Sequence, residues 1–411
     1  LENIDRVPDL DPELKKRYIG EAKVLRAYSY YELYTKFGDI PYTTKVLSIK
    51  ESMSIARTAK ATVIANVLAD LDEVINGNYL PTSYDADNKG RITRWAAMAI
   101  KAKIYLFEGN WTQVKNITST IMTEGGFKLF GSYAGLFEIA NEYNSEVILD
   151  AQYRPTSREH QMMYVFLPPT LGGYSQLSPL QELVDSYIML DGKTIKETGT
   201  SFDESHPYAN RDPRLKATVM YTGNSYTLAD GTEVVINCEK GEGKDGYGVG
   251  SDCSATGYYI KKYWDNTYRA TLYSGLNPIL IRYADILLMN AEALAELGEL
   301  DKTAWDATIK PIRDRAGFTL ASALEFPEGA SKDKLIEIVR NERRSELALE
   351  GHRHKDIIRW RIADNVLNGW CHGLKTNDVV GTDDGYVRVE NRTFNANKHY
   401  LWPIPQAERD L

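Results

Sequence analysis

Apolar residues recur at helical spacing in long stretches towards both ends of the chain. In the N-terminal part the periodicity predicts helices over residues 12–37, 59–75, 93–108 and 111–123. The first carries an apolar stripe and a second stripe of Tyr28, Tyr31 and Tyr34, so we expect neighbours to bury it on two sides. Gly38, with Pro41 just beyond it, predicts where this helix ends.

A second set of helical patterns occupies the C-terminal part. It predicts helices over residues 279–297, 301–316, 331–350 and 353–366. The segment 101–111 also resembles 291–300, because small residues at helical spacing precede a Gly turn in both. This internal repeat is typical of the helix pairs of tetratricopeptide (TPR) proteins.

The repeat predicts about four helix pairs, over residues 12–76, 91–124, 279–316 and 331–368. Each pair alone leaves an apolar face uncovered, so we expect the pairs to stack into a right-handed solenoid. We therefore predict a mainly α fold in a single domain, 1–411, in which the TPR-like scaffold comprises 12–124 and 279–368.

The middle of the chain, residues 125–278, differs in composition from both ends. It is rich in Gly, Ser, Thr, Asn, Asp and Tyr, and short β-like runs at 146–151, 216–221 and 258–263 lie between long loops. A short helical pattern at 179–189 interrupts them. Long irregular segments within a compact protein tend to be functional, so this loop-rich insertion is the predicted ligand-binding region.

Charge and cysteine content narrow the class of protein. The net charge of −8 argues against a nucleic-acid partner, which requires a basic face. Charged residues interrupt every long apolar run, so none is suited to span a bilayer. The cysteines Cys238, Cys253 and Cys371 lack metal-site spacing; isolated thiols are favoured over the alternative, a disulfide between the first two.

Motifs for catalysis, metal binding and cofactor binding are missing from the sequence. It has no nucleophile elbow, zinc-protease motif, phosphate loop or dinucleotide fingerprint. Residues 85–90 resemble the start of a calcium loop, but Lys89 and Ala96 stand where ligands are needed. His352 and His354 are too close in sequence to share a helix face. We predict no enzyme activity, no catalytic residue, no metal and no cofactor.

Acidic and basic residues alternate densely between Arg340 and Arg361. One interpretation is a site for an acidic ligand. The signs are balanced at helical spacing, which favours a network of ion pairs that joins the last two helices to the rest of the protein.

The chain contains 27 tyrosines and only 10 phenylalanines. A tyrosine ring is apolar on its face and polar at its tip, so it suits half-wet positions. Sugars present C–H faces that pack on rings and hydroxyl groups that seek hydrogen bonds. The content therefore favours sugar binding, although any single tyrosine is more often part of a helix packing seam.

Motifs along almost the whole chain resemble those of the SusD/RagB family. They are EAKVLRAYSYYELYTKFGDIP (21–41), GRIT (90–93), Ser178-Pro179 with ELVDSY (182–187), Asp191-Gly192, RDPR (211–214), Gly257-Tyr258 with KKY (261–263), IRYADILLMNAEA (281–293), IRDRAG (312–317), ERRSELALEGHR (342–353) with Asp356 and Arg359-Trp360, and Tyr400, PIP (403–405) and Glu408. Each motif is modest alone, and their order makes the resemblance strong.

The resemblance implies an outward-facing outer-membrane lipoprotein that binds oligosaccharide or polysaccharide. It would deliver the glycan to a partner SusC-like TonB-dependent transporter. The family's lipidated N-terminal cysteine and first helix, and its short C-terminal tail, have no counterpart in this sequence, so the lipid anchor is implied by the resemblance alone. The family motifs themselves, including Glu342, Arg343 and Arg344, are expected to be scaffold.

We expect the glycan to stack on aromatic side chains in the loops of the insertion. The candidates are Tyr153, Tyr164, Tyr174, Trp264, Tyr268 and Tyr273, with Arg158, Asn144 and Asn266 as hydrogen-bond partners. The alternative for each is a role in the core, most clearly for Trp264, which directly follows a predicted strand. Two other functions stay open, a glycoside hydrolase and a TPR-type adaptor that binds peptide.

Overall fold

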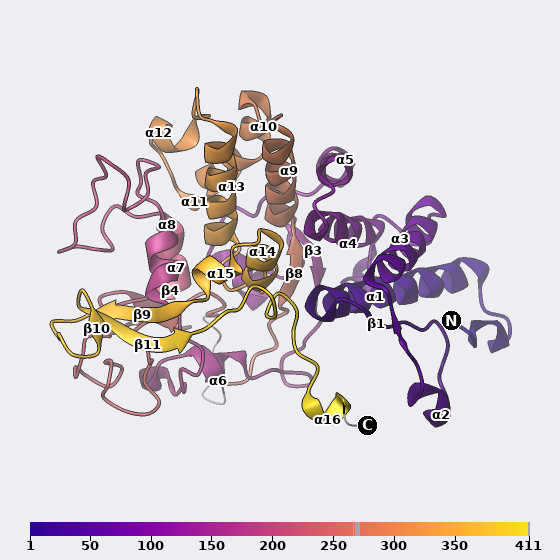
Figure 1. Cartoon of the computed structure of the whole chain (residues 1–411), viewed down its shortest axis with the longest axis horizontal. Coiled ribbons are helices and arrows are strands. Elements are labelled where there is room, and N and C mark those ends of the chain that lie inside the picture. Colours follow the sequence, from indigo (N-terminus) through magenta and orange to yellow (C-terminus); the bar gives the residue numbers. More distant parts are fainter. Residues whose placement is uncertain (266, 268–271, 410–411) are drawn as a thin grey trace. The chain divides into compact units, whose positions relative to one another are not determined.

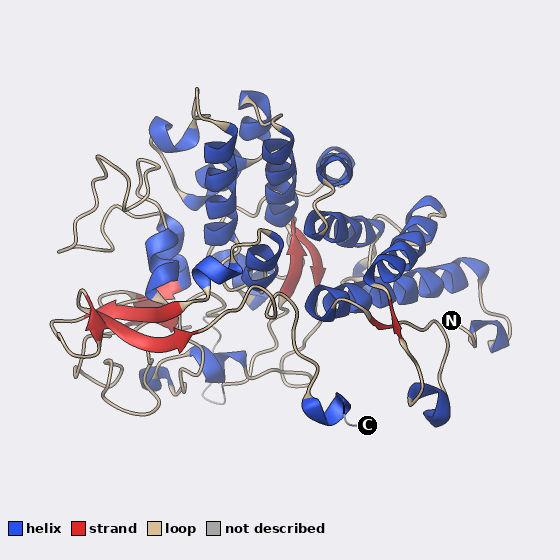
Figure 2. Cartoon of the chain, in the orientation of Figure 1, coloured by secondary structure: helices blue, strands red, loops and turns tan. Residues whose placement is uncertain are grey.

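The computed structural model describes residues 1–265, 267 and 272–409, coloured along the chain in Figure 1. Helices take up 42% of the chain and strands 11%, so the protein is mainly α, as predicted (Figure 2). The chain forms two compact units. The helical unit comprises residues 1–126, 354–366 and 394–411, and the mixed unit comprises 127–353 and 367–393. The prediction of one domain with four stacked pairs stays a prediction.

The helical unit is built on four long helices. They are α1 (Pro12–Phe37), α3 (Lys60–Asn76), α4 (Arg94–Phe107) and α5 (Trp111–Glu124). Asp11 caps the first with its side chain on the Leu14 N–H, and Pro12 follows at the first helical position. α1 packs on α3 and α4, and α4 on α5. Tyr31 and Tyr34 are buried in α1, as the tyrosine stripe predicts.

Short elements complete the helical unit. They are η1 (Ile4–Arg6), α2 (Ile49–Ser52), η2 (Ala86–Asn88), α14 (Arg353–Arg359), α15 (Ala363–Val366) and α16 (Gln406–Arg409), with β1 (Ile40–Pro41) antiparallel to β2 (Arg57–Thr58). No helix in the described part of the chain is both long and apolar enough to cross a membrane.

The mixed unit places α9 (Tyr283–Leu297) beside α13 (Lys332–Glu346), the two upright orange helices of Figure 1. Its other helices are α6 (Met162–Phe166), α7 (Gln181–Ser186), α8 (Pro213–Thr218), α10 (Lys302–Ala307), α11 (Ile309–Ala316) and α12 (Ala321–Leu324), with 3₁₀ turns η3 (Gly135–Phe137), η4 (Ile139–Asn141) and η5 (Pro169–Leu171). A core that includes Phe166, Tyr187, Leu215 and Tyr259 joins the loops of the insertion.

Small antiparallel sheets hold the mixed unit together. The pairs are β3 (Val147–Asp150) with β8 (Ile279–Arg282), β4 (Val219–Met220) with β7 (Tyr259–Ile260), and β5 (Ser225–Thr227) with β6 (Glu233–Val235). The largest sheet has three strands in the order β10 (Thr382–Asp383), β11 (Tyr386–Arg392) and β9 (Gly369–Lys375). The sequence did not predict this sheet.

Two predicted elements change type. Residues 279–282, predicted as the start of a helix, form β8, because a short run of Ile, Leu and Ile fits a strand as well as a buried helix. Residues 216–218, predicted as strand, belong to α8. Asp212 caps that helix on the Arg214 N–H at 2.9 Å, and Pro213 supplies its first residue, so the helix continues through Thr218.

Three predicted helices end early or break. Residues 301–316 form α10 and α11, because Pro311 cannot donate to the Ala307 carbonyl. α13 ends at Glu346 and not at 350, because Leu349 has a φ of 65°, outside the right-handed helical region. Residues 353–366 form α14 and α15, separated by Arg361 with a φ of 56°.

The predicted ion-pair network exists on the α13 side of the mixed unit. The carboxylate of Glu346 is fully buried and receives Arg282 at 2.6 Å and Arg214 at 2.9 Å, as well as Arg315. Arg343 pairs with Asp285 of α9 at 2.6 Å, which ties the two helices together. These residues are scaffold, as expected for the family motifs that contain them.

Candidate functional site

Two of the predicted residues, Tyr164 and Tyr174, stack on each other at the surface of the insertion. Their ring centroids are 4.3 Å apart with an interplanar angle of 30°. Tyr174 is 39% exposed and Tyr164 is half-buried, so the pair presents ring surface to solvent. We call these two residues the tyrosine pair.

The loop that carries the tyrosine pair is fixed from below. Met163 and Phe166 point from α6 into the core of the mixed unit. The Tyr174 N–H donates to the Tyr164 carbonyl at 3.0 Å. Gly173 makes this return possible, because a Cβ there would meet the Leu167 oxygen at 2.1 Å. The backbone of this loop thus holds the Tyr164 and Tyr174 rings against each other.

The tyrosine pair suits hydrogen bonding as well as stacking. The neighbouring Tyr174 hydroxyl raises the pKa of Tyr164, so its phenol stays protonated at neutral pH. A protonated phenol can donate one hydrogen bond and accept others. Two adjacent rings with polar tips can therefore hold the C–H face of a sugar and bond its hydroxyl groups.

Tyr153 and Arg158 lie at the two ends of a tight turn. The Arg158 guanidinium is 5.4 Å from the Tyr153 ring centroid, and the Arg154 and Arg158 backbones bridge across the turn. The Tyr153 ring also meets His160 edge-on, with centroids 4.8 Å apart. This turn is the second place where predicted candidates come together.

Backbone hydrogen bonds place Tyr273 near this turn. It precedes Ser274, which exchanges two backbone hydrogen bonds of 2.9 Å with His160. Tyr273 is 42% exposed. The candidates Tyr268 and Asn266 lie outside the described residues.

Asn144 and Trp264 are engaged in local structure. The Asn144 amide donates to the Asn141 carbonyl at 2.8 Å and accepts from the Glu146 N–H at 2.9 Å, which shapes the turn before β3. The Trp264 ring meets Tyr226 edge-on, and its N–H donates to the Thr227 carbonyl at 2.9 Å. These contacts give both residues a role in the local structure.

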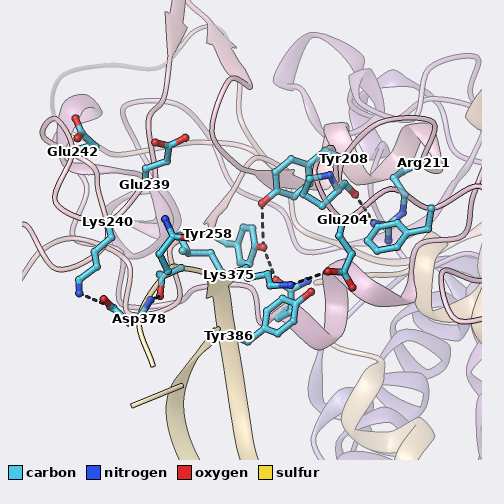
Figure 3. Close-up of a pocket in the computed structure, with 16 residues that line it drawn as sticks. Glu204, Tyr208, Arg211, Glu239, Lys240, Glu242, Tyr258, Lys375, Asp378 and Tyr386 are labelled. Atoms are coloured by element: carbon cyan, nitrogen blue, oxygen red, sulfur yellow. Dashed lines mark hydrogen bonds and ion pairs between the residues drawn. The ribbon is translucent and has the colours of Figure 1, made fainter. Parts of the chain in front are cut away.

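The mixed unit also contains a cavity of about 570 Å³, which the sequence did not predict (Figure 3). Its lining includes the rings of Phe202, Tyr208, Tyr258 and Tyr386 and a rim of charged side chains. The only signal in the sequence was the high tyrosine content, since these rings come from three distant segments. No described group of His, Cys, Asp and Glu side chains is arranged to hold a metal ion.

Comparison with known proteins identifies the family of the chain. Residues 136–411 match the family model described as the SusD family. The chain belongs to the SusD family. Residues 1–106 of this SusD-like protein match a second family, described as "Starch-binding associating with outer membrane". The predicted membership and the predicted mainly α, TPR-like fold are thus confirmed.

Individual relatives span most of this SusD-like chain. A SusD-like carbohydrate-binding protein from Bacteroides fragilis, of known structure, is 28% identical with a TM-score of 0.88, covering 100% of this chain and 82% of that one. A second SusD-like protein from the same species has 28% identity and a TM-score of 0.82. SusD-like protein P25 from Formosa agariphila is 28% identical over 89% of this chain and 68% of its own length.

Proposed function

We propose that this SusD-like protein binds oligosaccharide or polysaccharide at the cell surface without cleaving it. The observation that carries the proposal is the match over the whole chain to a B. fragilis protein named for carbohydrate binding. The tyrosine pair supplies a surface with the chemistry that sugar rings need. We assign it the central place in the site, and Tyr153, Arg158 and Tyr273, at the turn described above, are further candidates.

The protein would work as part of an uptake system. It would sit on the outer face of the outer membrane through a lipid anchor and pass glycan to a SusC-like TonB-dependent transporter. The outer-membrane description of the family that matches residues 1–106 supports this location. Co-purification with a β-barrel transporter from native membranes tests the partnership, and recovery without one would contradict it.

Affinity electrophoresis tests glycan binding. Gels that contain plant, yeast, host or bacterial glycans should retard the wild-type protein for at least one of them. Loss of a stacking ring costs about 1–3 kcal/mol where bases stack on aromatic side chains. We expect Tyr164→Ala and Tyr174→Ala to weaken retardation by a similar amount.

A matched control separates stacking from general effects. Tyr18 lies on α1 in the helical unit and is 40% exposed, almost the same as Tyr174. Tyr18→Ala should leave retardation unchanged. Equal loss in both variants would contradict the assigned site, and no retardation of the wild type by any glycan would contradict glycan binding. Release of reducing sugar from a bound glycan would instead point to a hydrolase.

A further inference from the structure

The cavity of the mixed unit has an aromatic wall that is held in place before any ligand arrives. Tyr208 stacks on Tyr221, with centroids 4.0 Å apart and an angle of 16°. The Tyr208 and Tyr258 hydroxyls are 3.2 Å apart, and Tyr258 donates to the Gln181 side chain at 2.5 Å (Figure 3). A fixed wall lowers the conformational entropy that its own side chains lose when a ligand binds.

The wall keeps its polar tips neutral. Burial raises the pKa of Tyr208 to about 12, so the hydroxyl is protonated at neutral pH. Tyr386, on β11, completes the wall on the side of the three-stranded sheet. The cavity therefore offers ring faces together with neutral hydroxyl groups, as the tyrosine pair does on the surface.

Each cation of the lining already has a partner. The Lys375 ammonium is 2.9 Å from Glu204, and Lys240 pairs with Asp378; Figure 3 draws both pairs. The buried Arg211 guanidinium donates to the carbonyl oxygens of Val184 at 2.6 Å and of Pro207 at 2.8 Å. Carboxylates therefore neutralise both ammonium groups, and carbonyl oxygens occupy N–H groups of the buried guanidinium.

Two carboxylates of the lining are left over. Glu239 and Glu242 share one turn, in which the Glu242 N–H donates to the Glu239 carbonyl at 3.2 Å. Within the described residues, neither side chain has an ion-pair partner or a side-chain hydrogen bond. The lining holds four carboxylates against two ammonium groups and one guanidinium, so its rim is net negative.

We propose that this cavity is a second saccharide site, which accepts an uncharged sugar unit and excludes sugars that carry sulfate or carboxylate groups. Hydroxyl groups of the sugar would donate to Glu239 and Glu242, and its C–H face would pack on the tyrosine wall. An anionic group would face the unpaired carboxylates at the rim, and juxtaposed like charges are unfavourable. The inference rests on the proposed function and narrows its substrate class.

The test compares each neutral glycan that retards the wild type with a sulfated derivative of the same polymer. Dextran with dextran sulfate and laminarin with sulfated laminarin are run in every case. Wild-type protein should bind the neutral member about tenfold or more tightly. The double variant Glu239→Gln/Glu242→Gln keeps side chains that can bond hydroxyl groups, so it should retain the neutral glycan and bind the sulfated one better.

A blocking variant locates the effect in the cavity. Asn377 lines the cavity and is exposed, so Asn377→Trp should fill the entrance and weaken binding of the neutral glycan about tenfold. Val380 lies in the same loop, is 93% exposed and does not line the cavity, so Val380→Trp should bind like the wild type. Thermal melting of both checks that each is folded.

The outcomes separate the two proposals. If Asn377→Trp binds like Val380→Trp while Tyr164→Ala and Tyr174→Ala weaken binding, the cavity is not a saccharide site and the proposed function stands. A wild-type preference for the sulfated polymers also overturns the inference alone. If the wild type binds no polymer of either kind, the inference falls together with glycan binding.

Discussion

Two groups of glutamates in the mixed unit use the same side chain for opposite purposes. The side chains of Glu346 and Glu350 are buried, and their oxygens are bonded to Arg214, Arg282 or Lys262 at 2.6–2.9 Å. Glu239 and Glu242 at the cavity rim are exposed, and their carboxylates are open. A glutamate whose oxygens are all bonded within the protein stabilises the fold, whereas one left open is available to a ligand.

The buried group illustrates why such charges are hard to replace. Burial alone would raise the pKa of Glu346, but Arg315, Arg282 and Arg214 lower it well below its ordinary value. The carboxylate is therefore charged at neutral pH, and it compensates three guanidinium groups that are themselves buried. Removing one partner of such a network leaves an uncompensated charge, which costs more than the pair contributes.

The largest expected effect comes from Glu346→Gln. The substitution keeps the shape and removes the charge, so Arg214, Arg282 and Arg315 lose their common partner. We expect the free energy of unfolding to fall by about 3–5 kcal/mol, measured by chemical denaturation. Glu337→Gln in the same helix, where the side chain is 62% exposed beside Lys334, is the matched control and should change little. An equal fall in the free energy of unfolding for both variants would contradict the assignment of Glu346 to the scaffold.

The same group predicts how stability changes with pH. Burial raises the pKa of Glu350, but Arg282 and Lys262 lower it to about 2 in the folded state. Folding lowers the pKa of Glu350. Its contribution to the free energy of unfolding is therefore complete above the unfolded-state pKa and is lost as pH falls through roughly 4 to 2. Thermal melting across this range should show a steep loss for the wild type and a shallower one for Glu350→Gln. Parallel curves would show that Glu350 is not responsible.

The sequence predicted the buried group well, because its signal is local. Balanced charges at helical spacing between Arg340 and Arg361 indicated ion pairs, and Glu346 and Arg343 form them. Long helices were placed within a few residues for the same reason. The errors fall where the tertiary context decides, as at β8, where a short apolar run ending at Arg282 pairs with β3.

The open glutamates and the cavity could not have been predicted in the same way. Phe202, Tyr258 and Tyr386 lie far apart in the sequence, and only folding brings them to one wall. The three-stranded sheet does have a local signal in the sequence. Asp384-Gly385 precedes an alternating strand, and an Asp-Gly pair in that setting is a strong hairpin signal. The tyrosine pair was predicted as two residues, and their stacking depends on the Gly173 turn.

A smaller effect is expected from that hairpin, which carries Tyr386 to the cavity wall. Asp384 and Gly385 both have positive φ, 50° and 86°, and Asp383 pairs with Tyr386 across them, which defines a type I′ turn. In Gly385→Ala a Cβ would meet the Thr376 carbonyl oxygen at 2.8 Å. We expect the free energy of unfolding to fall by about 1–2 kcal/mol and amide exchange in β10 and β11 to become faster. Asp384→Asn, which tolerates the same conformation, should have no such effect.

The smallest effect sharpens the comparison most directly, because it repeats the first substitution at the other group. Glu239 has no side-chain partner among the described residues, so Glu239→Gln leaves nothing unpaired inside the protein. We expect its free energy of unfolding to stay within about 0.5 kcal/mol of the wild type, as for most surface changes. A loss close to that of Glu346→Gln would mean that the cavity rim is part of the scaffold. Unchanged stability together with altered discrimination against sulfated glycan would mean that this carboxylate is retained for the ligand.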